Sequence, residues 1–319
     1  MKIWYTNSNG GINMSKLKSF TFKSNYDQLS IAGLCIIPNQ PIKAIVQFVH
    51  GMAEHKERYF DIMSFLAKEG YMCVIHDHRG HGESIKKKDD LGYFYDEDGF
   101  ALVNDAHQLT KQIRDVMPHV PLILCGHSMG SLVVRSYVKR YDQDVDGLIV
   151  IGSPSNNKAS KAGLKMIRAL KKIQGDRTRN LLIEKMIFGT YNKNCKGTSK
   201  NSWICYDDTV VKAYDQDPLC GFTFTLNGFE NLLCLVRYTY DKKGWALKNL
   251  KMPVLFLAGA DDPCIHTKSD FDKAVLSMYE VGYHNLCAKL YKGMRHEILN
   301  EINKNEVYDD ILTWLNENF

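Results

Sequence analysis

The chain has 319 residues, which is enough to bury a large core as one large domain or as one domain that carries an insertion. Its composition is ordinary for a globular protein, and no run of 18 apolar residues is present, which excludes a long apolar spanning segment. The first residues lack the apolar core of a signal peptide, and the nine cysteines are scattered singly, without the paired spacing of a zinc site. We therefore expect a cytoplasmic protein with reduced thiols.

The formal net charge of +5 is distributed unevenly along the chain. Residues 155–245 carry 16 Lys and Arg against 8 Asp and Glu, a net of +8, and the rest of the chain therefore carries −3. Such a segment can favour an anionic surface such as a membrane, or it can be a solvated face. Its basic residues are not interleaved with aromatic ones as in a single-strand binding groove, so we expect no nucleic-acid partner.

From residue 43 onward, segments with the composition of buried strands alternate with segments of helical periodicity. The predicted strands are 19–23, 29–37, 43–49, 71–75, 122–125, 147–152, 254–258 and 286–291. The predicted helices are 59–69, 101–117, one that ends at about 141, 268–281 and 305–315. The first two strands are predicted to form a hairpin, and the alternation that follows indicates the α/β class, with a mainly parallel sheet covered by helices on both faces.

The alternation stops between residues 155 and 245, where helical stretches and loops occur without a clear strand. We interpret this interruption as a helical cap inserted into a core formed by residues 17–154 and 246–319. Residues 1–16 are polar and Gly-rich, and we expect them to be a loose N-terminal segment.

The segment Gly126-His-Ser-Met-Gly130 links a predicted strand to a predicted helix. A nucleophile elbow holds its serine in a strained conformation on such a turn, and the residues two before and two after it lack side chains so that strand and helix can pass closely. The alternative is an ordinary Gly-rich turn. The strand before it and the helix after it favour Ser128 as a nucleophile.

A serine nucleophile needs a histidine to take its proton and a carboxylate to orient that histidine. In a fold of this kind the acid and then the histidine follow the serine, on loops at the carboxyl ends of later strands. Asp261 and Asp262 follow one such strand, and the spacing alone leaves the choice between them open. His266, His284 and His296 come after these acids, and we favour His296 because it alone lies just past the carboxyl end of a strand.

The tetrahedral intermediate of acyl transfer needs two preorganised N–H donors. One is expected from the backbone of Met129, directly after the serine, and the other from Met52 in the loop after the third strand. That loop could also be a simple Gly turn at a strand end. We expect Glu54 and His55 to brace it.

The loop Asp77-His-Arg-Gly-His-Gly82 contains residue types that can bind a metal, but no further ligand set accompanies it. We interpret it as a rigid Gly-rich loop that borders the site, and we expect no metal. No segment is typical of a dinucleotide-binding or phosphate-binding Gly loop, so we expect no cofactor.

Five motifs together support a resemblance to a known family. They are His50-Gly-Met-Ala-Glu-His55, Asp77-His-Arg-Gly-His-Gly82, Gly126-His-Ser-Met-Gly130, Gly259-x-x-Asp262-Pro263 and His296-Glu-x-x-Asn-Glu301. In these motifs and their order, residues 18–319 resemble the monoacylglycerol lipase and lysophospholipase family of α/β-hydrolases, which is also grouped with the serine aminopeptidases. The segment Asp217-Pro-Leu-Cys-Gly-Phe-Thr-Phe-Thr225 resembles part of the cap of bacterial members.

The resemblance implies an α/β-hydrolase fold with Ser128 as nucleophile, Asp262 as acid and His296 as base. It implies an oxyanion site at the amides of Met52 and Met129. The implied activity is hydrolysis of carboxylic esters of apolar acyl groups, such as a monoacylglycerol or a lysophospholipid. The alternatives are an esterase, thioesterase or peptidase that acts on another small substrate, and a non-catalytic binding protein on the same scaffold.

The predicted cap contains one amphipathic segment between residues 158 and 173. Basic residues occupy one face of it, and Leu164, Ile167, Leu170 and Ile173 are expected on another. The basic residues are Lys158, Lys161, Lys165, Arg168 and Lys172. The segment is then either a lid that covers an acyl chain and makes weak contact with an anionic membrane, or a helix with its apolar face on the core and its lysines in water.

Overall fold

The structure is a computed structural model, which describes residues 15–156, 159–193, 195 and 197–319. Its strands are β1 (Lys16–Lys23), β2 (Ser30–Ile37), β3 (Ala44–Val49), β4 (Tyr71–His76), β5 (Leu122–His127), β6 (Gly147–Ile151), β7 (Val254–Gly259) and β8 (Leu286–Tyr291). The α-helices of the core are α1 (Phe60–Lys68), α2 (Phe100–Val116), α3 (Met129–Tyr141), α8 (Lys268–Val281) and α9 (Lys304–Asn318). The predicted loose segment 1–16 falls almost wholly outside the described residues, and β1 begins at Lys16.

The eight strands form one sheet in the order β1-β2-β4-β3-β5-β6-β7-β8. β1 and β2 are the predicted hairpin, and β2 is antiparallel to both of its neighbours. All other neighbouring strands pair in parallel, from β4 through β3 to β8. The sheet is therefore mainly parallel, as the alternation of strands and helices predicted, and its carboxyl ends lie at one edge.

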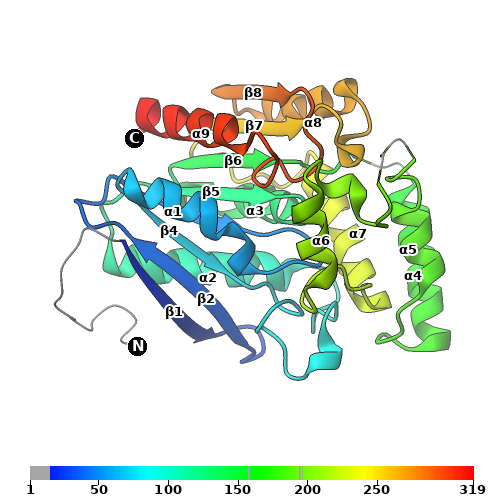
Figure 1. The fold of residues 1–319 in the computed structure, drawn as a ribbon. Helices are drawn as coiled ribbons and strands as arrows, with labels where there is room; N and C mark the ends of the chain where they lie inside the picture. The colour runs from blue at the N-terminus through cyan, green and yellow to red at the C-terminus, as the bar shows by residue number, and fades with distance from the viewer. Residues whose placement is uncertain (1–14, 157–158, 194, 196) are drawn as a thin grey trace.

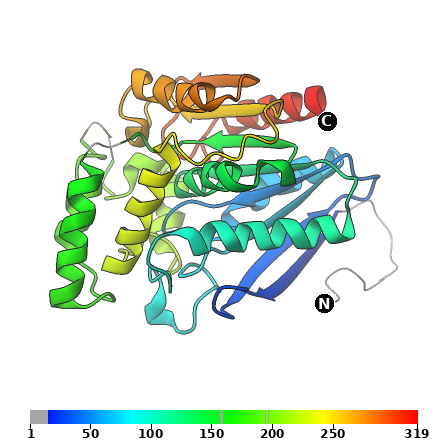
Figure 2. The same cartoon turned by 180° about the vertical axis from the view of Figure 1, so that it is seen from behind.

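Helices cover both faces of the sheet, and each face has its own apolar core. One core packs side chains of α1 and α9 on the sheet, and the other packs side chains of α2, α3 and α8. Figure 1 shows α1 and α9 in front of the strands, and Figure 2, from behind, shows the helices of the opposite face. The central strands β3 to β7 are buried along their whole length, which is why their sequences are continuous apolar runs.

The chain between β6 and β7 forms α4 (Ser160–Gln174), α5 (Leu181–Phe188), α6 (Asp208–Gln216) and α7 (Leu226–Tyr240), and contains no strand among its described residues. These helices gather beyond one end of the sheet (Figures 1 and 2). Helix α7 packs against both α3 and α4 and so connects this group to the core. No helix among the described residues is long and apolar enough to cross a bilayer.

The amphipathic pattern of α4 is correct in part. Leu164 and Ile167 are buried and Leu170 is partly buried against the core, but Ile173 is 82% exposed, so its predicted place on the apolar face is wrong. Ile173 follows Leu164 by nine residues, and at about 100° per residue this places it on the opposite side of the helix. Lys158 lies outside the described residues.

Candidate active site

Ser128 occupies the turn between β5 and α3. Its backbone has φ 54° and ψ −118°, a strained conformation for a residue with a side chain. A Cβ on Gly126 would lie 2.4 Å from the carbonyl oxygen of Gly130, and a Cβ on Gly130 would lie 2.0 Å from that of Val49. Both glycines are therefore required for the strand and the helix to pass each other at this turn.

His296 and Asp262 form a buried pair on loops that follow β8 and β7. Nδ1 of His296 and Oδ2 of Asp262 are 2.9 Å apart, and the other carboxylate oxygen accepts a hydrogen bond of 2.8 Å from the backbone N–H of Cys264. Asp261 is exposed, and its carboxylate accepts a hydrogen bond from the hydroxyl of Tyr206 instead. Of the two aspartates left open by spacing, Asp262 is the one that contacts the histidine.

The other ring nitrogen of His296 faces the interior of the site. Nε2 lies 3.8 Å from Sγ of Cys264, a thiol whose pKa burial raises well above its usual value. Among the described residues no hydrogen bond joins Nε2 to the hydroxyl of Ser128, although both residues line one cavity. Such bonds are often long in the absence of substrate and shorten when it binds. Asp262, Cys264 and His296 also place ligand atoms within 4.8 Å of one another.

The β3 loop, residues 50–55, lies beside the serine. An added Cβ on Gly51 would lie 3.2 Å from Cβ of Ser128, which places the backbone before Met52 against the nucleophile turn. Met129 is the first residue of α3, where backbone N–H groups have no partner within the helix. Met52, Ser128 and Met129 all line the same cavity. The structure therefore brings the two predicted amide donors and the serine together.

Glu54 is the centre of a buried network that supports this loop. Its Oε1 accepts hydrogen bonds from the backbone of Gly51 (2.6 Å) and the hydroxyl of Tyr59 (3.0 Å), and its Oε2 accepts one from Arg58 (2.8 Å). Burial alone would raise the pKa of Glu54, but the hydrogen bond with His127 and the charge of Arg58 hold it well below its usual range. The carboxylate is therefore ionised, and it holds the β3 loop in place as predicted.

His127 and Glu297 connect this network to the histidine loop, and sequence reasoning did not identify them. Nδ1 of His127 lies 3.4 Å from Oε1 of Glu54, and its Nε2 lies 3.1 Å from the backbone oxygen of His296. Burial lowers the pKa of His127, but the bond to Glu54 outweighs it, so the pKa is raised. Glu297 accepts two hydrogen bonds from Arg58, of 2.7 and 2.6 Å. The available signal was their position, because each is next to a predicted site residue and belongs to one of the five motifs.

A cavity of about 740 Å³ opens onto Ser128 and His296. Its other walls come mainly from apolar side chains of α4, α5 and α7, including Ile167, Ile183, Phe188, Leu232 and Val236. The indole of Trp203, also from the segment between β6 and β7, lies 5.0 Å from the ring of His296, centroid to centroid. The space beside the serine thus suits an apolar group.

The fold and the arrangement of these loops define an α/β-hydrolase. The family described as serine aminopeptidase, S33, matches residues 40–303, and the chain belongs to this family. This confirms both the resemblance that the five motifs indicate and the predicted fold class.

Relatives of known name cover nearly the whole chain. A monoacylglycerol lipase of Mycolicibacterium smegmatis is 26% identical over 92% of this chain and 97% of its own length. The monoglyceride lipase of Homo sapiens is 25% identical over 88% of this chain and 84% of its own length.

Two solved structures show the same fold at lower identity. A thermostable carboxyl esterase from Bacillus coagulans, in complex with glycerol, superposes with a TM-score of 0.84 at 24% identity over 95% of this chain and 98% of that one. A soluble variant of the monoglyceride lipase from Saccharomyces cerevisiae gives a TM-score of 0.71 at 19% identity over 100% of this chain and 98% of that one.

Proposed function

We propose that this protein is a serine hydrolase that cleaves carboxylic esters of apolar acyl groups, with monoacylglycerols and lysophospholipids as its substrate class. The observation that carries the proposal is that the strained Ser128 and His296, which is paired with Asp262, border one apolar cavity. A serine becomes an effective nucleophile only beside such a base, and a cavity with apolar walls stabilises an acyl chain by removing it from water.

In the proposed reaction, the hydroxyl of Ser128 attacks the ester carbonyl and gives its proton to Nε2 of His296. Asp262 keeps the Nδ1 proton in place and stabilises the imidazolium that forms. The N–H groups of Met52 and Met129 stabilise the negative oxygen of the tetrahedral intermediate. The alcohol leaves with the proton from His296, and water then releases the acyl group from Ser128 by the same steps.

The lipid substrate class is supported by the cavity and by the names of the relatives. Residues 155–245 act as a cap in this proposal, since their helices supply most of the apolar walls. Besides the monoacylglycerol lipases, a phospholipase of Bacillus subtilis is 23% identical over 83% of this chain. The nine cysteines are free thiols, which supports a reducing compartment, and we place the protein in the cytoplasm.

The decisive experiment compares Ser128→Ala with Ser155→Ala. Ser155 lines the same cavity but lies beyond β6, where its hydroxyl donates to the backbone oxygen of Ile265. Ser128→Ala should lower the hydrolysis of a monoacylglycerol by at least about 10⁴-fold and abolish labelling by a fluorophosphonate, while Ser155→Ala keeps both. Full activity in Ser128→Ala would exclude this serine, and activity only on thioesters or peptides would exclude the lipid class.

We also propose that the outer surface of α4 and α5 contacts anionic membranes weakly. Four large apolar side chains there are mostly exposed: Ile173 (82%), Leu181 (69%), Leu182 (72%) and Met186 (69%). Exposed lysines lie on the same two helices at positions 161, 165, 172 and 185. Leu181 and Met186 also line the cavity, so the apolar surface is continuous with it. An apolar surface among lysines suits the interface of an anionic bilayer.

Flotation with vesicles tests the membrane contact. The wild type should float with anionic vesicles, less so at high salt, and Leu182→Ser should float at least about threefold less. Leu276→Ser is the matched control, because Leu276 is a 51% exposed leucine on α8. Equal flotation of both variants, or none by the wild type, would exclude the contact.

A further inference from the structure

The turn at residues 217–221, here called the cap turn, rests directly on the β3 loop. The backbone N–H of Gly221 and the hydroxyl of Tyr214 each donate a hydrogen bond of 2.9 Å to the backbone oxygen of Ala53. A segment between β6 and β7 is thus joined to the loop that contains Met52, the proposed oxyanion donor. Three side chains meet at this junction and have no part in the proposed hydrolysis.

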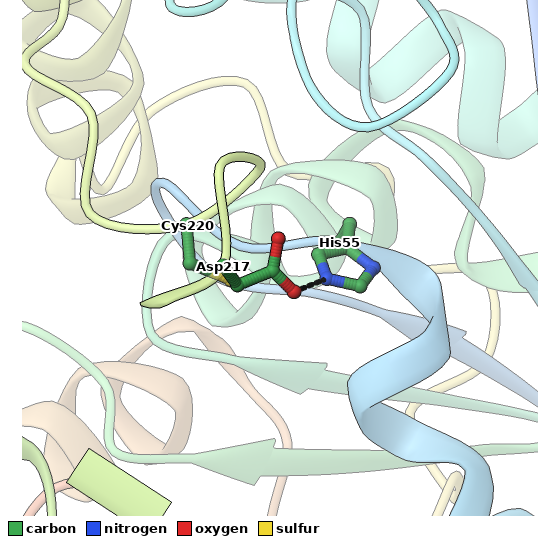
Figure 3. A group of neighbouring side chains, drawn as sticks. All are labelled: His55, Asp217 and Cys220. Carbon is green, nitrogen blue, oxygen red and sulfur yellow. Dashed lines mark hydrogen bonds and ion pairs between the residues drawn. The ribbon is translucent and has the colours of Figure 1, made fainter. Parts of the chain in front are cut away.

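These three side chains are His55 from the β3 loop and Asp217 and Cys220 from the cap turn (Figure 3). Their ligand atoms all lie within 4.8 Å of one another, and Nε2 of His55 is 2.8 Å from Oδ2 of Asp217. We propose that His55, Asp217 and Cys220 form a zinc-binding site that joins the cap turn to the β3 loop.

The set of ligand types favours zinc over Ca²⁺ and Mg²⁺. An imidazole nitrogen, a carboxylate oxygen and a thiolate sulfur are the three donors that Zn²⁺ takes in proteins, whereas Ca²⁺ and Mg²⁺ take oxygen alone. Zinc bonds of about 2.0–2.3 Å in a tetrahedron need ligand atoms about 3.3–3.7 Å apart. The carboxylate of Asp217 must therefore withdraw slightly from His55, and water takes the fourth position.

The surroundings of His55 match those of a zinc-bound histidine. Its Nδ1 lies 2.6 Å from Oε2 of Glu57, which leaves Nε2 directed at the other two ligands. A carboxylate on the far nitrogen of a ligating histidine fixes its tautomer and raises its basicity. Asp217 is fixed too, because its Oδ1 accepts a hydrogen bond of 2.8 Å from the N–H of Leu219.

The site stabilises positive charge at the position that zinc would take. Burial by itself lowers the pKa of His55, but Cys220, Glu57 and Asp217 outweigh it and raise the pKa to about 11. Two cations lie beside these groups: Nζ of Lys56 is 2.8 Å from Oε1 of Glu57, and Arg58, which Glu54 and Glu297 neutralise, lies near Cys220.

An ion can reach the site from solvent. His55 and Cys220 are buried, but the side chain of Asp217 is 32% exposed. The ligands do not line the main cavity, although Ala53, Tyr214 and Gly221 beside them do. A bound ion would hold the cap turn against the β3 loop without blocking the serine.

Titration of the metal-free protein with Co²⁺, followed by displacement with Zn²⁺, tests the proposal. The wild type should bind one Co²⁺ per chain with a thiolate-to-cobalt absorption band, which Zn²⁺ removes. Cys220→Ser should lack the band, and Asp217→Asn should weaken Zn²⁺ binding by at least about tenfold while keeping its fold by circular dichroism.

Two matched variants separate this site from other thiols. Cys264→Ser removes the thiol beside His296, and Cys287→Ser removes the exposed thiol, and both should keep the band and the Zn²⁺ affinity. Zn²⁺ should also raise the unfolding midpoint of the wild type and of both controls, but not that of Cys220→Ser. Absence of the band in the wild type would overturn the proposal. Loss of the band in Cys264→Ser together with its retention in Cys220→Ser would also overturn it.

Discussion

The backbone N–H of Gly51 donates a hydrogen bond of 2.6 Å to Oε1 of Glu54, three residues further along the β3 loop. This bond closes the loop on itself immediately before Met52, whose N–H is the proposed second oxyanion donor. Because Glu54 also bonds to Arg58 and contacts His127, one ionised carboxylate fixes the loop relative to the serine and the histidine.

Replacing this carboxylate should weaken the stabilisation of the transition state more than substrate binding. Glu54→Gln is expected to lower kcat by about 10- to 100-fold and to change KM little. A displaced N–H donor stabilises the oxyanion less well, but the loss is smaller than if the donor were absent. Ester hydrolysis at several substrate concentrations separates the two constants. Glu69→Gln, an exposed glutamate just after α1, should match the wild type. A change in KM alone would contradict the role given to Glu54.

The two neighbouring aspartates provide a test within one loop. Asp262→Asn leaves the shape of the pair but removes the charge that stabilises the His296 imidazolium, so kcat should fall by about 10⁴-fold. Asp261→Asn removes a negative charge at the surface and leaves an amide oxygen that can accept the hydrogen bond from the hydroxyl of Tyr206, so its kcat should stay within about threefold. Comparable losses in both variants would show that Asp262 is not the orienting acid.

The sequence predicted the sheet well, because its strands are buried on both faces and so appear as continuous apolar runs between helical segments. All eight predicted strands are present, and the helix predicted at 268–281 begins and ends at those residues. The same local pattern placed Ser128 on a strand-to-helix turn, where the structure has it.

Contacts between distant loops could not be predicted in this way. The choice between Asp261 and Asp262 depends on the direction of two side chains, which spacing does not encode. The bond between Arg58 and Glu297 joins residues 239 positions apart, and Trp203 reaches His296 from a segment with no regular periodicity. Ile173 shows the opposite error, since its apolar character suggested a buried face that helix geometry does not give it.

Gly152 lies under the His296–Asp262 pair, and a side chain there should disturb it. Gly152 has φ +55°, and an added Cβ would lie 3.3 Å from Nδ1 of His296 and 3.4 Å from Oδ2 of Asp262. Gly152→Ala should lower kcat by about tenfold, because the pair must shift by a few tenths of an ångström, and should reduce the free energy of unfolding by about 1–2 kcal/mol. Gly244 has φ +78° and open space around it. Gly244→Ala should therefore lower the free energy of unfolding through the strained backbone alone, and its kcat should be normal.

Buried neutral histidines near the β3 loop should make the protein sensitive to acid. Burial lowers the pKa of His76 and of His81 from 6.5 to about 4. Neither ring nitrogen of His76 has a hydrogen-bond partner among the described residues, and the ring of His81 packs against Phe94, Phe222 and Phe224. Protonation of either histidine would place an unpaired charge in the core.

The free energy of unfolding should therefore fall as the pH drops from about 6.5 to about 4, because in this range the unfolded chain binds protons at His76 and His81 that the folded protein does not. Each histidine accounts for up to about 3 kcal/mol of this loss near pH 4, and above pH 6.5 neither contributes. His76→Leu should be less acid-sensitive, retaining about 2 kcal/mol more of its neutral-pH stability than the wild type at pH 5, as measured by urea unfolding. His284 is exposed, and His284→Leu should leave the pH dependence of the free energy of unfolding unchanged. An unchanged pH dependence in His76→Leu would mean that His76 is not protonated on unfolding.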